Sequence, residues 1–188
     1  EERRKTIDLQ HASKSSEVGP SNPVAGEPTE TTHFAIVDKD GAMVSNTYTI
    51  NDWFGAGVTA KGTGILLNDE MDDFTAQPGV PNVYGLLQGD QNAIQPKKRP
   101  LSSSTPTFVE GPRGLMIIGS PGGSYIPGMV ILGTLNFMDG RSAQEIVSAP
   151  RFHHQFSSDV LQFETDAFTA EERQALEARG HTLKEGSR

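Results

Sequence analysis

The sequence changes character at Thr31, and this change limits which part of the chain can fold. Residues 1–30 contain no aromatic residue, and Ser, Pro, Gly, Glu and Lys dominate 11–30. Such a segment cannot bury enough apolar surface to offset the entropy lost on ordering, so we expect an exposed or disordered tail. Residues 31–188 instead alternate between strand-like and helix-like patterns. They are numerous enough for one domain with a sizeable core, which we expect to span 31–188.

The order of these patterns predicts the fold class. Runs rich in β-branched and aromatic residues predict strands at 33–38, 43–51, 62–68, 105–110, 115–119 and 160–164. Apolar residues at helical spacing, with capping residues before them, predict helices at 125–138, 142–148 and 169–179. Strands come first, then helices, then a further strand and helix. This order favours an α+β fold with antiparallel sheet.

Composition excludes several classes of function. The formal net charge of −8 argues against a nucleic-acid partner, which would require a basic face. The longest apolar run, at 129–132, is far too short to span a bilayer. The chain has no cysteine, which excludes disulfides, thiolate metal sites and a cysteine nucleophile.

Thr31 and Thr32 stand between the tail and the first predicted strand. A threonine acts as both nucleophile and base only when its own α-amino group is free, so it must begin a chain. Cleavage of the bond between Glu30 and Thr31 would create that arrangement. A threonine pair also opens many strands, because threonine favours extended backbone. The pair alone does not decide between these two interpretations.

Two polar clusters could bind charged groups. Ser102 and Ser103 follow the cationic run at 97–99, and such a group suits a carboxylate as well as ordinary loop hydrogen bonds. Glu70 and Asp73 belong to an acidic cluster, which suits an ammonium group, a metal or a solvated turn. Neither cluster identifies its ligand by itself.

A glycine-rich segment at 119–124 lies between a predicted strand and a predicted helix. Backbone N–H groups at such a junction can bind a phosphate or an oxyanion, because glycine allows close approach and the helix start is partly positive. No Gly-Lys-Ser/Thr follows, so it is not a nucleotide-binding loop. His153 and His154 are adjacent and should point to different faces, so we expect no metal site there. No Gly-X-Ser-X-Gly elbow occurs in the chain.

Taken together, the order and spacing of several segments resemble the gamma-glutamyltranspeptidase family. The resemblance runs from Thr31 to about Arg188, and the tail resembles the end of that family's large subunit. The segments that carry it are TTHF at 31–34, VDKDG at 37–41, TYTIN at 47–51, GILLN at 64–68, MDDF at 71–74, PGVPNVYG at 78–85, KRPLSS at 98–103, GSPGGS at 119–124 and APRFHHQ at 149–155.

The resemblance implies the N-terminal-nucleophile hydrolase fold, a four-layer αββα sandwich of which this chain would carry one subunit. In that family a precursor cuts itself before the nucleophilic threonine, here between Glu30 and Thr31, and yields two subunits that stay together. Residues 1–30 would be the end of the large subunit, and 31–188 the small-subunit catalytic domain. We expect that domain to be incomplete at its C-terminal end, and the chain alone to be inactive.

The resemblance also implies a role for each matching residue. Thr31 would be the nucleophile, and Thr49 would hydrogen-bond it and support both cleavage and catalysis. Gly122 and Gly123 would form the oxyanion hole. Tyr84 would gate the pocket from a lid loop. The donor's α-ammonium would lie against Asn51, Glu70 and Asp73, and its α-carboxylate against Ser102 and Ser103.

The implied reaction is cleavage of gamma-glutamyl amides such as glutathione through a threonyl ester. The glutamyl group then passes to water or to an amino acid or peptide acceptor. The implied partner is the large subunit of the same precursor, the implied compartment is periplasmic or secreted, and neither a metal nor a cofactor is expected. A cephalosporin acylase of the same fold is the closest alternative, but its glutaryl substrate has no α-ammonium and no need of Asp73. A non-catalytic protein would have no need of Thr31.

Overall fold

The computed structural model describes residue 5 and residues 7–14, 31–82, 86–156 and 159–186. The chain divides into two compact units. One comprises Ala25–Ser148, and the other comprises Glu1–Val24 together with Ala149–Arg188. Both units contain helices and strands, in keeping with the α+β class. That 31–188 acts as one catalytic domain stays a prediction.

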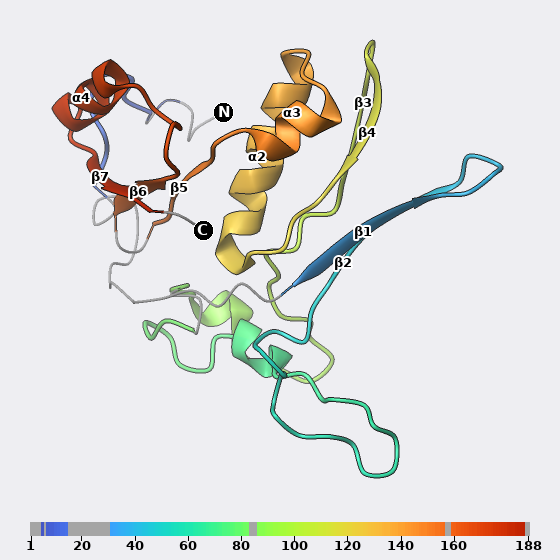
Figure 1. Ribbon diagram of the computed structural model, residues 1–188. Coiled ribbons are helices and arrows are strands. Elements are labelled where there is room, and N and C mark those ends of the chain that lie inside the picture. The colour runs from blue at the N-terminus through green and yellow to red at the C-terminus, as the bar shows by residue number, and fades with distance from the viewer. Residues whose placement is uncertain (1–4, 6, 15–30, 83–85, 157–158, 187–188) are drawn as a thin grey trace. The chain divides into compact units, whose positions relative to one another are not determined.

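The first unit begins with a long two-stranded ribbon (Figure 1). Strands β1 (Thr32–Val37) and β2 (Met43–Tyr48) pair antiparallel, with Val37 opposite Met43 at the turn. The predicted turn between them is confirmed. Asp38 Oδ1 accepts hydrogen bonds from the N–H groups of Asp40 (2.9 Å) and Ala42 (2.8 Å). Gly41 adopts a φ of +86°, which favours glycine.

This ribbon exposes much apolar surface. It is a two-stranded sheet, and six of its large apolar side chains are at least 40% exposed. They come from both strands and from neighbouring positions along them, so both faces of the ribbon are apolar. They are Phe34, Ile36, Val37, Met43, Val44 and Tyr48.

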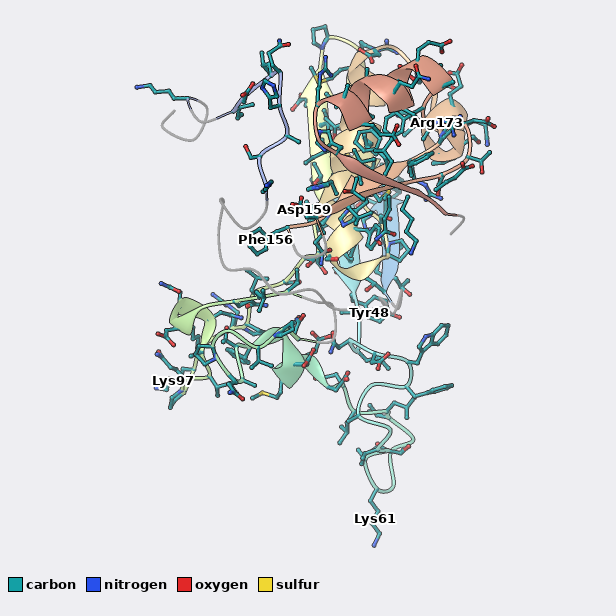
Figure 2. The ribbon with its side chains drawn as sticks, turned by 90° about the vertical axis from the view of Figure 1, so that its left-hand side faces the viewer. Tyr48, Lys61, Lys97, Phe156, Asp159 and Arg173 are labelled. Carbon is teal, nitrogen blue, oxygen red and sulfur yellow. The ribbon has the colours of Figure 1, made fainter. Side chains whose placement is uncertain are left out.

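The prediction of a strand at 62–68 is wrong. Gly62 adopts a φ of +80°, which interrupts an extended strand, and the segment folds back as a loop with one isolated bridge between Thr59 and Leu66. Lys61 stands at the tip of this loop and points away from it (Figure 2). The apolar residues of this segment suggested a strand. Composition does not show where the backbone must turn, so the prediction failed.

Two short 3-10 turns follow, η2 (Glu70–Asp73) and η3 (Asp90–Asn92). Thr75, which is only 6% exposed, fastens them to each other. Its N–H donates to the carbonyl of Asn92 (3.0 Å), and its hydroxyl donates to the carbonyl of Gly89 (3.0 Å). The second turn is thereby held against the segment that leaves the first.

The predicted hairpin and helices after residue 105 are confirmed. Strands β3 (Thr107–Gly111) and β4 (Gly114–Ile118) pair antiparallel. The turn η4 (Gly123–Tyr125) then leads into α2 (Ile126–Met138), followed by α3 (Ala143–Ser148).

Helix α2 packs on β4 through a close contact. A Cβ on Gly133 would lie 2.3 Å from Ile118 Cδ1, so the missing side chain lets the two elements approach. Its buried residues, Ile126, Val130 and Gly133, recur at helical spacing and form one face. No helix in the described part of the chain is long and apolar enough to cross a membrane.

The second unit is a three-stranded sheet beside one helix. It contains β5 (Phe152–His154), β6 (Val160–Phe163), α4 (Ala170–Ala178) and β7 (Thr182–Glu185). Strand β6 pairs antiparallel with β5 but parallel with β7, which corrects the expectation of purely antiparallel sheet. Helix α4 makes the crossover that a parallel pair requires. Thr169 caps that helix as predicted, and Glu172 completes a capping box with it.

Candidate active site

Thr31 and Thr49 line one cavity. Thr31 directly precedes β1, Thr49 directly follows β2, and the register pairs Thr32 with Tyr48. Antiparallel pairing therefore places the two threonines at the same end of the ribbon. The cavity measures about 320 Å³ and is lined by Thr31, Thr32, Tyr48, Thr49, Ile50, Asp52, Trp53 and Phe54. Glu30, the other half of the predicted cleavage site, lies outside the described residues.

A tight turn connects this cavity to the acidic segment. Asn51 is 2% exposed with a φ of +76°, and its N–H donates to Thr49 Oγ1 (2.9 Å). Its side-chain Nδ2 donates to the carbonyl of Asp69 (3.4 Å). The next N–H, that of Asp52, donates to Asp69 Oδ1 (3.1 Å). The predicted site residues Thr49 and Asn51 are thus bonded to each other and to the residue before η2.

Glu70 and Asp73 stand at the two ends of η2, on the same face of that turn. Burial, then the hydrogen bond and charge of Asp73, and finally the charge of Asp69 raise the pKa of Glu70 to about 7. Burial and the charges of Asp72 and Asp69 also raise the pKa of Asp73, although the hydrogen bond from Glu70 opposes this. Glu70 Oε1 is buried and has no hydrogen-bond partner among the described residues. Two neighbouring, half-buried carboxyl groups of this kind favour the binding of a cation.

Ser102 and Ser103 lie on a loop that local hydrogen bonds hold in place. Ser102 Oγ accepts from the N–H of Ser104 (3.2 Å), and the carbonyl of Ser103 accepts from the hydroxyl of Thr105 (2.8 Å). The N–H of Leu101 donates to Asn92 Oδ1 (2.9 Å). The segment before the serine pair is therefore tied to η3.

The cationic run before these serines is partly engaged elsewhere. The ammonium group of Lys98 donates to the carbonyls of Ala93 (3.0 Å) and Gln91. It therefore stabilises the end of η3, where helix-type carbonyls lack partners. The sequence instead suggested that Lys98 helps to bind a carboxylate beside Ser102 and Ser103.

Gly122 and Gly123 lie where they were predicted, between β4 and α2. Both are buried, with φ values of +126° and +53°, a backbone that favours glycine. Just before them, Gly119 meets the ring of His33 in β1, and a Cβ there would lie 2.1 Å from His33 Nδ1. The start of β1 and the end of β4 are therefore in contact, and the glycine turn begins beside the strand that follows Thr31.

Sequence reasoning missed two residues of this region, His33 and Asn92. His33 Nδ1 lies 2.8 Å from the hydroxyl of Thr47, burial lowers the pKa of the ring, and the buried Nε2 has no hydrogen-bond partner among the described residues. Asn92 bonds two segments of the site. Neither residue carries a sequence signal of its role, because the role depends on contacts between distant segments.

The remaining residues that the sequence singled out are Tyr84 and the pair of His153 and His154. Tyr84, the predicted lid residue, is not among the described residues. His153 is buried in the second unit with Gln155 Oε1 3.2 Å from its Nε2, whereas the exposed His154 lies 3.1 Å from Asp159 Oδ1. The two rings therefore face different surroundings, as expected for neighbours on a strand. Among the described residues, no three His, Cys, Asp or Glu side chains are grouped to hold a metal ion.

Sequence comparison finds a family that matches the whole chain. The sequence profile of the gamma-glutamyltranspeptidase family matches residues 1–188. The chain is 51% identical over 179 residues to the glutathione hydrolase proenzyme of Pseudomonas sp. (strain A14). That match covers 94% of this chain and 31% of the relative, so the chain spans about a third of the length of this relative and of the glutathione hydrolase proenzyme of Escherichia coli (strain K12).

Comparison of folds agrees with this result. The chain resembles a mutant of the gamma-glutamyltranspeptidase of Helicobacter pylori, with a TM-score of 0.78 and 43% identity, over 82% of this chain and 84% of that one. It resembles a cephalosporin acylase of Bacillus halodurans less closely, with a TM-score of 0.68 and 28% identity, over 100% of this chain and 31% of that one. The predicted fold, a partial α+β unit of the N-terminal-nucleophile hydrolase type, is confirmed. The chain belongs to the gamma-glutamyltranspeptidase family.

Proposed function

We propose that this chain supplies the nucleophile and the donor-binding groups of an enzyme that cleaves gamma-glutamyl amides such as glutathione. The observation that carries the proposal is one connected site. Thr31 and Thr49 share a cavity, and hydrogen bonds from Asn51 join its wall to the segment of the carboxyl pair. Because the chain spans about a third of its relatives, this activity belongs to the whole protein.

The chemistry begins with cleavage of the precursor between Glu30 and Thr31, which frees the α-amine of Thr31. Thr31 Oγ1 then attacks the carbonyl carbon of the γ-amide, and the free amine takes the hydroxyl proton. The N–H groups at Gly122 and Gly123 stabilise the oxyanion. The α-amine of Thr31 passes the proton to the amine of the donor's γ-amide as the C–N bond breaks. That amine then leaves, and a glutamyl ester remains on Thr31. Water or an acceptor amine releases the glutamyl group from this ester.

Recognition of the donor uses its two charged ends. Glu70 and Asp73, with Asn51, hold the α-ammonium, because a cation relieves the repulsion between two half-buried carboxyl groups. Ser102 and Ser103 hold the α-carboxylate through hydroxyl hydrogen bonds. Tyr84 closes the pocket from the lid loop. No step needs a cofactor.

The large subunit of the same precursor is the partner we propose. The ribbon of β1 and β2 exposes apolar side chains on both faces, and a surface of that kind marks an interface. Unpaired strand edges also favour a covering element. By the same family relation, we place the enzyme in the periplasm or outside the cell.

Cleavage of glutaryl amides by an acylase of the same fold is the second candidate. A glutaryl group has no ammonium, so two neighbouring half-buried carboxyl groups would repel one another without compensation. The placement of Glu70 and Asp73 at the two ends of η2, where a single ammonium can meet both carboxyl groups, therefore favours the glutamyl donor.

Selectivity between the two substrates tests this choice. In the complete precursor, Asp73→Asn removes one charge from the pair without changing its shape. We expect kcat/KM for gamma-glutamyl p-nitroanilide to fall about a hundredfold or more, because the loss of one partner of a desolvated charge pair is costly. Turnover of glutaryl p-nitroanilide should change far less. Equal losses on both substrates would rule out the ammonium role of Asp73.

A further inference from the structure

Asn92 lies between the two segments that hold the charged groups of the proposed site. Its Nδ2 donates to the carbonyl of Asp73 (2.7 Å), and its Oδ1 accepts from the N–H of Leu101 (2.9 Å), directly before Ser102. The same Nδ2 contacts Gln88 Oε1. One half-buried amide therefore connects η2, which carries the carboxyl pair, to the serine segment.

The orientation of this amide is fixed by its partners. A backbone carbonyl only accepts and a backbone N–H only donates, so Nδ2 must face Asp73 and Oδ1 must face Leu101. Asparagine offers one donor nitrogen and one acceptor oxygen at this reach. Aspartate keeps only the acceptor, and alanine keeps neither.

The backbone of Asn92 is held as firmly as its side chain. Its carbonyl accepts from the N–H of Thr75, whose hydroxyl donates to the carbonyl of Gly89. Lys98 binds the carbonyls on either side of it, those of Gln91 and Ala93. The amide is thus a fixed spacer, not a mobile surface group.

We infer that Asn92 is a positioning residue that sets the separation between the ammonium-binding and carboxylate-binding groups. This inference rests on the proposed function. A ligand with both charged ends requires both groups at one fixed spacing, whereas a ligand with one end requires only one group. Loss of the spacer therefore penalises only ligands that bridge the two, because preorganisation is lost for them alone.

Inhibition constants test this in the complete precursor after self-cleavage. The ligands are L-glutamate, which has both ends, glutarate, which lacks the ammonium, and 4-aminobutanoate, which lacks the α-carboxylate. For Asn92→Ala we expect the Ki of glutamate and the KM of gamma-glutamyl p-nitroanilide to rise about tenfold, the effect of one or two lost hydrogen bonds. The Ki values of glutarate and 4-aminobutanoate should change less than about threefold, and so should kcat.

Gln91→Ala is the matched control, because it removes an exposed amide from the same turn. It should leave all three inhibition constants unchanged. Asn92→Asp keeps the bond to Leu101 and loses the bond to Asp73, so it should show the same selectivity if Asn92→Ala does not fold. Equal weakening of all three ligands, or no change in glutamate binding, would overturn the inference alone. A wild-type protein that releases no glutamyl group would overturn the proposed function and this inference with it.

Discussion

The two carboxyl groups of η2 make the proposed site responsive to pH. The pKa of Glu70 is raised to about 7 by burial and by Asp73 and Asp69. Near neutral pH the pair therefore exchanges between a state with a shared proton and a state with both groups ionised. A bound ammonium stabilises the ionised state, because opposite charge favours the charged form.

The pH dependence of donor binding follows from this. We expect the KM of gamma-glutamyl p-nitroanilide to fall as pH rises through about 7, because deprotonation of Glu70 restores a charge that attracts the ammonium. In Glu70→Gln the dependence near pH 7 should disappear, since the amide does not titrate. A wild-type KM that stays constant between pH 6 and pH 8, values that lie roughly one unit either side of that pKa, would contradict this role.

The raised pKa of Glu70 also affects the stability of the protein without a bound donor, and here a rise in pH is unfavourable. The folded state binds the proton of Glu70 more tightly than the unfolded chain, because its pKa is raised from 4.5 to about 7. Its contribution to stability is complete below pH 4.5 and is lost as pH rises through about 7. The thermal midpoint of the wild-type protein should therefore fall as pH rises from 4.5 through about 7, and Glu70→Gln should make this fall smaller. A fall of the same size in Glu70→Gln would show that another group titrates.

At the level of residues, the sequence was informative where chemistry is local. Thr31, Thr49, Asn51 and the carboxyl pair are found in one connected region, although their roles stay predictions. Asn92 could not be found in this way. An asparagine in a polar loop is ordinary, and its function depends on Asp73 and Leu101, which are 19 and 9 residues away.

Contact at the end of strand β4 brings together the start of β1, which follows Thr31, and the start of the glycine-rich segment at 119–124. The close approach depends on the missing side chain of Gly119, against which the ring of His33 lies. Thr47 holds that ring through a 2.8 Å contact between His33 Nδ1 and its hydroxyl, so the ring has little freedom to move away.

Gly119→Ala tests this contact. We expect a loss of about 1–3 kcal/mol in stability, because the added methyl overlaps a confined ring. Self-cleavage of the complete precursor should also slow, since β1 would shift relative to β4. Gly111→Ala is the matched control, because a Cβ there meets nothing within 4 Å. Equal thermal midpoints for the two variants would show that the contact is not confining.

Elements with local start and stop signals were predicted well. The turn at Asp38 and the N-cap at Thr169 are present because their hydrogen bonds join residues at most four apart. The strand wrongly predicted at 62–68 and the unpredicted strands β5 and β7 show the limit of this approach. Whether a short segment becomes a strand depends on a distant partner, and β7 is paired by β6.

At the scale of the whole molecule, the exposed ribbon of β1 and β2 is the surface that we propose the large subunit covers. Its apolar residues lie on both faces, and the chain spans about a third of its relatives. A surface that becomes buried by another subunit does not tolerate an unpaired charge. This gives a direct test of the proposed heterodimer.

Ile36→Asp places a charge on the ribbon. In the complete precursor after cleavage, we expect a thermal midpoint lower by about 5 °C or more, and earlier dissociation of the two subunits in size-exclusion chromatography. Lys39→Ala, at the exposed turn, should change neither. An Ile36→Asp protein as stable as wild type would show that the large subunit does not cover this position.

The most direct measurement is the intact mass of the complete precursor over time, without added protease. The wild-type protein should give two fragments from a single cut between Glu30 and Thr31, and Thr31→Ala should remain one uncut chain. The reason is that Thr31 Oγ1 is the attacking atom, and alanine has no hydroxyl. If the Thr31→Ala precursor is still cut at the same bond, Thr31 is not the nucleophile and the proposed mechanism is wrong.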